Sequence, residues 1–258
     1  LFQNADDAYC QLMREPSKIP YFCIDNDEKN LIIKHSGRPI NQVRVGSPAE
    51  YKEDLLNMLK IGWSDKASMS KQTGKFGYGF KTVYLLAEEP HIISGDYNFI
   101  IKGALYPKQV SGDNDYSDET IINLKLNEKG NRKISEIIES FSTIAKYQIL
   151  FSQKIRKIEI NKKIYSWEPK ITEKEHFIIE ETEDYLVFKN RPSNENPHLE
   201  RGILAFRKKG NKIIEFDKEA PKLWCMAPLN DLPNIGFALS ANFKTNTGRQ
   251  TLAWNDDK

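Results

Sequence analysis

The sequence predicts an α+β protein: a two-layer sandwich with helices over a mixed, mostly antiparallel sheet, followed by a smaller strand-rich segment. Two observations predict this class. Helical periodicity and short β-branched or aromatic runs occur together in residues 1–167. From about Glu168, short strands separated by Pro, Gly and Asn turns follow one another. We therefore expect one domain over residues 1–167 and a strand-rich extension, or the start of a middle domain, over residues 168–258.

The first elements are a helix and a strand hairpin. Leu1, Ala5, Ala8 and Leu12 in LFQNADDAYCQLMRE recur at helical spacing and form one apolar face. Two prolines in EPSKIP end this helix. YFCID and NLIIKHSG are strand-like runs on either side of the turn-rich NDEKN, so they predict a hairpin.

The remaining elements of the first domain follow in order. Helices are predicted in PAEYKEDLLNMLKIG, FKTVYLLAEE and ISEIIESFSTIAKYQIL. Strands are predicted in HIISGDYNFIIKGALYP, DETIINLKL and KIRKIEINKKIYSW. Between the first two of these helices, the polar stretch WSDKASMSKQT has the composition of a mobile lid. Beyond it, the second domain is predicted to contain the strands HFIIEE, DYLVFKN, GILAFRKKGNKIIEF, KLWCMAPL and GFALSANFKT.

Composition excludes several classes of protein. No apolar run reaches the roughly 20 residues of a membrane-spanning helix. A net charge of +2 gives no general footprint for nucleic acid, although a local patch stays open. The three scattered cysteines favour reduced thiols in the cytoplasm and give no zinc spacing. Because Leu1 falls inside a predicted helix, we expect a piece of a longer chain without a signal peptide.

A glycine cluster in GKFGYGFKT is the first candidate for binding chemistry. Gly74, Gly77 and Gly79 form G-x-x-G-x-G, which fits neither the dinucleotide fingerprint nor the P-loop, since Phe80 occupies the P-loop lysine position. A glycine-rich turn that opens a helix presents free N–H groups and suits an anion such as phosphate. A purely structural glycine turn is the alternative.

Two further stretches are candidates for the same site. In NADDA, Asn4 offers an amide oxygen for a cation, and Ala8, one helical turn on, leaves a gap for a flat ring. The alternative is a helix with acidic residues on its solvent side. In HSGRP, Gly37 and Pro39 follow a strand, and the alternative there is an ordinary turn.

Together and in this order, these motifs resemble the GHKL, or Bergerat-fold, ATPases, which include gyrase, the ninety-kilodalton heat-shock chaperone, histidine kinases and MutL. QNADDA, IGWSDK, GKFGYGFKTVY and PHIISG are most similar to the sacsin-like branch, related to the chaperone. The resemblance covers most of residues 1–165 and extends to LPNIGFALSANFKTNTGRQTLAW near the end. It implies a Bergerat fold that binds ATP with Mg²⁺.

The resemblance also implies roles for individual residues. Asn4 matches the Mg²⁺-coordinating asparagine, Ala8 lines the adenine pocket, Gly37 lies beneath adenine, and Thr120 lies near the adenine edge. Asp7 matches an acidic position with a structural role. The phosphate-contacting loop corresponds to Gly74, Lys75, Phe76, Gly77, Tyr78, Gly79 and Phe80.

Two basic residues have roles that the resemblance leaves open. Lys66 lies in the lid and is either a phosphate contact or a solvated charge. Arg249 either stabilises charge on the γ-phosphate during hydrolysis or is a surface arginine in a turn.

The chain departs from the family pattern at two points. His35 replaces the adenine-reading aspartate of D-x-G-x-G, and Pro39 replaces the last glycine. Histidine accepts a hydrogen bond from an amine only through an unprotonated nitrogen, so the selectivity of the pocket for adenine over other nucleotide bases is in question. The family's general-base glutamate, four residues before Asn4, would fall immediately before Leu1.

The expected function is Mg²⁺-dependent ATP binding and ATP hydrolysis. These steps are expected to drive lid closure in a larger sacsin-like or chaperone-like protein, for which a role in bacterial defence is one expectation. The expected partners are ATP and ADP, further domains of a longer chain, and either a protein client or a nucleotide-dependent dimer. Two alternatives stay open: a DNA-associated GHKL module of the MutL or MORC type, and a nucleotide-binding pseudo-ATPase scaffold. Neither a membrane nor nucleic acid is indicated by the charge and hydropathy of the chain.

Overall fold

The structure, a computed structural model, describes residues 1–12, 18–41, 53–59, 79–110, 117–191, 202–225, 227–246 and 250–253. The chain divides into two units. The first consists of Leu1–Ala145 and Gln153–Ser166, and the second of Lys146–Ser152 and Trp167–Lys258. The sequence predictions that fall on residues 60–78 and 247–249 therefore lie outside the described residues.

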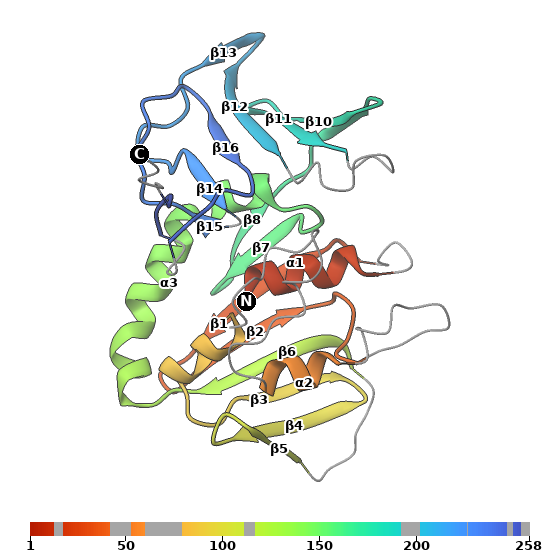
Figure 1. Ribbon diagram of the computed structural model, residues 1–258, viewed down its shortest axis with the longest axis vertical. Coiled ribbons are helices and arrows are strands. Elements are labelled where there is room, and N and C mark those ends of the chain that lie inside the picture. Colours follow the sequence, from red (N-terminus) through yellow and green to blue (C-terminus); the bar gives the residue numbers. More distant parts are fainter. Residues whose placement is uncertain are drawn as a thin grey trace, which may run out of the picture. The chain divides into compact units, whose positions relative to one another are not determined.

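The first unit is built on an eight-stranded mixed sheet in the order β5-β4-β3-β6-β2-β1-β7-β8 (Figure 1). All neighbouring strands are antiparallel except β1 and β7, which are parallel. The strands are β1 (Tyr21–Asn26), β2 (Asn30–His35), β3 (His91–Gly95), β4 (Tyr97–Lys102), β5 (Tyr106–Gln109), β6 (Ser117–Lys125), β7 (Lys157–Ile160) and β8 (Lys163–Ser166).

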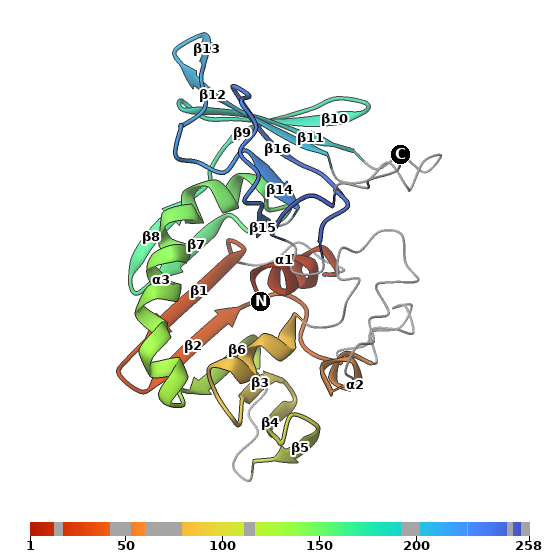
Figure 2. The same cartoon turned by 60° about the vertical axis from the view of Figure 1, so that its left-hand side comes forward.

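The described residues of the first unit form the helices α1 (Phe2–Cys10), α2 (Asp54–Leu59), the 3-10 helix η3 (Phe80–Leu85) and α3 (Glu128–Gln148), whose last residues belong to the second unit. Two of these helices, α1 and α3, pack on the sheet through aromatic side chains. Figure 2 shows α1 and α3 next to β1. Phe22 of β1 lies between them, with ring centroids 5.2 Å from Phe2 and 6.1 Å from Phe141. Edge-to-face aromatic contacts of this kind hold both helices on the sheet.

The core face of the sheet follows from strand alternation. In β2, Leu31 and Ile33 are buried, and they pair with the buried Leu124 and Ile122 of β6. Ile122 pairs in turn with the fully buried Ile92 of β3. Because successive side chains of a strand point to opposite faces, these pairs make one apolar layer across the three strands.

The second unit has its own mixed sheet, in the order β15-β14-β16-β12-β11-β10-β9, with β13 paired to β12. Its strands are β9 (Lys170–Glu173), β10 (Phe177–Glu181), β11 (Tyr185–Asn190), β12 (Ile203–Lys209), β13 (Lys212–Ile214), β14 (Leu223–Cys225), β15 (Ala227–Pro228) and β16 (Ala238–Ser240). Phe151 of the 3-10 helix η4 (Ile149–Phe151) stacks on the buried Trp224 with ring centroids 4.8 Å apart.

The predicted fold class is wrong. The structure is strand-rich, with 40% strand and 23% helix, and forms two mixed sheets with few helices instead of one two-layer sandwich of helices over a sheet. None of the helices formed by the described residues has the length and apolar character needed to cross a membrane.

The fold class was predicted wrongly because sequence periodicity does not report which segments pair in the folded protein. FKTVYLLAEE forms only the six-residue η3 before Ala87 bridges to Leu126, so tertiary pairing ends that helix early. The strands after residue 168 also pair with one another into a complete sheet. Local patterns identify strands, but they do not tell how many strands join one sheet.

The start of α3 allows a test of this packing. Asn127 caps the helix by accepting a hydrogen bond from the Gly130 N–H at 2.7 Å, while its own N–H donates to the Leu86 carbonyl at 2.8 Å. A Cβ on Gly130 would come closer than 3.0 Å to the Leu86 carbonyl oxygen. This close approach leaves room only for glycine.

We predict that Gly130→Ala lowers the free energy of unfolding by roughly 1–3 kcal/mol in urea denaturation, because the clash outweighs alanine's better helix propensity of about 1 kcal/mol. Gly236→Ala is the matched control, since a Cβ there meets nothing within 4 Å. A stabilised Gly130→Ala variant would contradict the close packing.

Candidate functional site

The apolar core face of the first sheet turns polar at one end. His35, the last residue of β2, pairs with Thr120 of β6, two residues along the strands from the apolar pair of Ile33 and Ile122. Thr120 Oγ1 lies 2.6 Å from Ser94 Oγ of β3. All three side chains are buried, with exposed fractions of 8% for His35, 4% for Thr120 and 0% for Ser94. We call His35, Thr120 and Ser94 the polar row.

The polar row is tied to the segment that follows β2. Ser94 Oγ accepts a hydrogen bond from the Ile40 N–H at 2.9 Å in addition to its contact with Thr120. Ser94 lies where the register between β3 and β6 shifts, between Ile93 and Gly95. Such irregularities turn a side chain toward a new partner, and here the serine holds the segment after β2 against the sheet.

A turn over residues 36–38 packs directly on α1. A Cβ on Gly37 would lie 2.8 Å from the Ala8 Cβ and 3.0 Å from the Tyr9 nitrogen. The Arg38 N–H also donates to the Ala8 carbonyl at 3.1 Å. Since Gly37 is not among the positive-φ residues, its lack of a side chain serves this close approach and not an unusual backbone conformation.

The Tyr9 hydroxyl joins the same turn to the start of β1. It accepts hydrogen bonds from the N–H groups of Tyr21, at 3.0 Å, and Ser36, at 2.9 Å, and donates to the Tyr21 carbonyl at 2.9 Å. Tyr9 is 2% exposed. One buried hydroxyl therefore satisfies three backbone groups that would otherwise lack partners.

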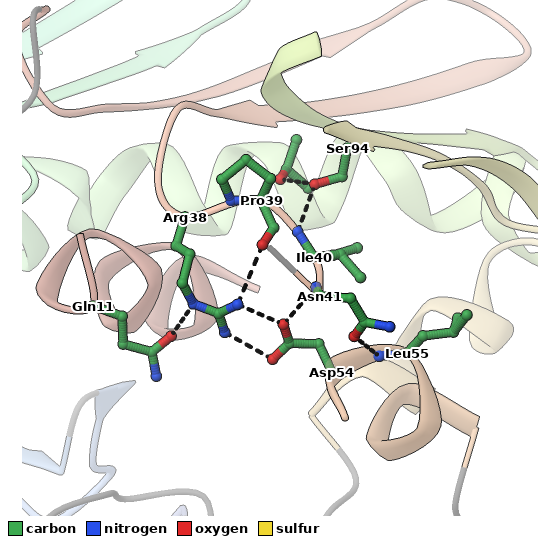
Figure 3. A network of polar contacts seen from close by, with 9 residues as sticks. Gln11, Arg38, Pro39, Ile40, Asn41, Asp54, Leu55 and Ser94 are labelled. Carbon is green, nitrogen blue, oxygen red and sulfur yellow. Dashed lines mark hydrogen bonds and ion pairs between the residues drawn. The ribbon is translucent and has the colours of Figure 1, made fainter. Parts of the chain in front are cut away.

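Beyond Gly37, an ion pair fixes the turn to α2. Arg38 donates two hydrogen bonds to the carboxylate of Asp54, at 2.7 and 2.8 Å, and a third to Gln11 Oε1 at 2.9 Å (Figure 3). The Asn41 N–H donates to the same carboxylate at 2.8 Å, while Asn41 Oδ1 accepts from the Leu55 N–H. Bidentate arginine pairs are directional as well as strong, so the turn is held in one orientation.

His35 is neutral and has a defined tautomer. Burial, the largest cause, lowers the pKa of His35 from 6.5 to about 4. Nδ1 accepts a hydrogen bond from the Gly37 N–H at 3.2 Å. Because a nitrogen that accepts cannot carry the proton, the proton of the neutral ring is on Nε2.

Sequence reasoning missed several residues of this arrangement. Asp6, which the alternative interpretation of NADDA places on a solvent side, is 1% exposed and accepts hydrogen bonds from the N–H groups of Gln153, Lys154 and Ile155 at 2.9, 2.9 and 3.1 Å. Asp7 is also buried. For Ser94, the signal was a hydroxyl residue at a buried position in the apolar run PHIISG. The partners of Asp6 lie more than 140 residues away, and no local pattern marks them.

The structure brings together four of the predicted site residues, namely Ala8, His35, Gly37 and Thr120. Asn4 is exposed on α1, one turn before Ala8. Gly79 precedes η3, and a Cβ on it would meet nothing within 4 Å, while Phe80 is 8% exposed and packs on Tyr84. The remaining predicted residues lie outside the described residues: Lys66, Gly74, Lys75, Phe76, Gly77, Tyr78 and Arg249.

The polar row offers uncharged hydrogen-bonding groups, which suit binding. The polar row contributes an imidazole and two hydroxyls, and Ala8 and Gly37 contribute small surfaces. In the described part of the chain, no three His, Cys, Asp or Glu side chains gather in a way that would hold a metal ion. These neutral side chains suit a neutral heterocycle as ligand better than an anion. They are also less suited to proton transfer.

Comparison with known protein families gives a match to the first part of the chain. The family model described as Sacsin domain matches residues 1–127, the part of the chain that contains α1, the turn after β2 and the polar row, and it supports a sacsin-like relationship for this part. No curated protein matches the chain.

We predict that Gly37→Ala destabilises the protein by roughly 1–3 kcal/mol, because its Cβ would overlap Ala8. Ala8→Gly alone should cost about 1 kcal/mol through helix propensity. In the double variant the Ala8 Cβ is absent and no longer overlaps the new Cβ at position 37. The double variant should therefore be about 1 kcal/mol more stable in urea denaturation than the sum of the two single effects predicts. Strictly additive effects would contradict direct packing of these two residues.

A second prediction concerns pH. Unfolded His35 binds a proton near pH 6.5, whereas the folded protein holds its pKa at about 4. The unfolded state therefore binds more protons between these values, and stability falls as the pH drops from 6.5 to 4. We expect urea denaturation to show a loss of roughly 3 kcal/mol that His35→Asn, which keeps an acceptor for Gly37, does not show. Equal pH dependence in both proteins would contradict the burial of a neutral His35.

Proposed function

We propose that the first unit binds ATP with Mg²⁺, the base end of the nucleotide lying against the turn at Gly37 and the polar row. The observation that carries the proposal is the packing of Gly37 on Ala8 beside three buried polar side chains. A few fixed polar groups beside small residues are what orients a bound heterocycle.

The order of motifs supports the proposal independently. The helix with Asn4 and Ala8, the strand end with His35 and Gly37, and the G-x-x-G-x-G loop follow one another as in GHKL ATPases. The Sacsin domain match spans all three. The finer assignment to the GHKL ATPases is part of the proposal and rests on this order of motifs.

The phosphates and Mg²⁺ would be held at the other end of the site. Asn4 is exposed on the helix that carries Ala8, and amide oxygens are ordinary ligands of Mg²⁺. The glycine loop of residues 74–79 would supply N–H groups to the phosphates. Bound Mg²⁺ would neutralise phosphate charge and orient the γ-phosphate.

Hydrolysis and movement complete the proposed activity. Water would attack the γ-phosphorus, and the bond to the β–γ bridging oxygen would break, so that ADP and inorganic phosphate leave; Arg249 is the proposed stabiliser of the developing charge. Closure of the polar segment of residues 63–73 over the nucleotide would link binding to a conformational change in further domains or a partner.

We predict that Asn4→Ala weakens Mg²⁺-dependent ATP binding about tenfold, measured by titration calorimetry with and without excess EDTA. The exposed position of Asn4 makes an unchanged melting temperature the expected companion result. Cys10→Ala, at the other exposed position of α1, serves as the matched control and should bind ATP like the parent protein.

Absence of ATP binding by the parent protein at millimolar nucleotide would rule out the proposed function. Equal ATP binding by the parent protein and Asn4→Ala would exclude only the role of Asn4 in binding Mg²⁺ and would leave the proposed ATP binding standing.

A further inference from the structure

The polar row has more hydrogen-bond donors than it has acceptors among the described residues. Nδ1 of His35 is used by the Gly37 N–H, and Nε2 carries the ring proton. Among the residues that the structure describes, no group pairs with Nε2, although His35 is only 8% exposed. Nε2 is not one of the fully buried side-chain atoms that lack a partner in the described residues, so its N–H can donate to water or to a ligand.

The hydroxyl pair adds a second donor that has no acceptor among the residues that the structure describes. Ser94 and Thr120 have two hydroxyl protons between them, and the 2.6 Å contact uses one of these protons. The Ile40 N–H donates to Ser94 Oγ and therefore uses an acceptor position, not a proton. Whichever hydroxyl donates within the pair, the other keeps its proton for a different acceptor.

An aspartate at the end of β2 would present the opposite pattern, because a carboxylate only accepts hydrogen bonds. A carboxylate thus suits an exocyclic amine, whereas an N–H donor facing an amine leaves both groups unsatisfied. A carbonyl oxygen accepts from both kinds of donor that the polar row offers. The lowered pKa of His35 supports this pattern, because a neutral ring keeps Nδ1 as the acceptor for Gly37.

We propose that the polar row selects a purine triphosphate with a carbonyl oxygen at position 6, such as ITP or GTP, over ATP, with His35 Nε2–H as the donor to that oxygen. This inference rests on the proposed function, since it assumes that the nucleotide base lies at the polar row. It changes the preferred base and leaves the proposed phosphate and Mg²⁺ interactions as they are.

ITP and ATP are a matched pair of probes, because they differ only at position 6 and in the protonation of N1. Titration calorimetry with Mg²⁺ should give about tenfold tighter binding of ITP than of ATP by the parent protein, from the hydrogen bond that the amine cannot accept. GTP should follow ITP.

Variants at position 35 identify the donor. His35→Asp should reverse the preference, because the carboxylate accepts from the adenine amine. His35→Asn, which keeps an acceptor for the Gly37 N–H and offers both hydrogen-bond roles, should bring the two affinities within about threefold of each other. His176→Asp is the control at an exposed histidine of the second unit and should keep the parent preference. Thermal unfolding of each variant checks that it folds.

The outcomes separate the two proposals. Tighter ITP binding that His35→Asn or His35→Asp abolishes supports the inference. ATP binding as tight as or tighter than ITP binding by the parent protein overturns it and leaves the proposed function standing. No binding of any triphosphate overturns both.

Discussion

The close packing of Gly37 on α1 at Ala8 is the contact on which the rest of the site depends. It brings the turn after β2 near enough for the Arg38 N–H to reach the Ala8 carbonyl and for the Tyr9 hydroxyl to reach the Ser36 N–H. A side chain at position 37 would separate the helix from the turn. One missing Cβ therefore allows several buried hydrogen bonds, each of which would be costly to leave unmade.

The polarity of the site follows from the same packing. Once the turn covers the end of β2, His35 is buried and its pKa is lowered, and its Nδ1 accepts a hydrogen bond from the Gly37 N–H. Ser94 holds the next part of the segment through Ile40, and the Arg38 to Asp54 pair holds it to α2. The chain thus surrounds a neutral, donor-rich group with fixed elements, which is what recognition of a heterocycle requires.

Sequence reasoning predicted much of the local structure, and it named four residues that the structure brings together. The first helix, the hairpin of β1 and β2, and the long α3 follow from periodicity and turn residues, since these depend on neighbours in the chain. Ala8, His35, Gly37 and Thr120 were named as site residues through the resemblance to the GHKL ATPases, and Thr120 through that resemblance alone. Ser94, Asp6 and Arg38 acquire their roles from partners on other elements. The fold class was predicted incorrectly for the same reason, because the pairing of strands into two sheets depends on distant partners.

The proposed base end of the nucleotide site consists of the turn at Gly37 and the polar row. Amide and methyl chemical shifts, followed by NMR during titration with a Mg²⁺-bound purine triphosphate, show which residues the nucleotide contacts. If the base binds there, we expect the largest shift changes of the described residues at Ala8, Gly37 and Thr120, with a change at the His35 ring. Saturating changes confined to the second unit, with these residues unaffected, would contradict this placement of the base.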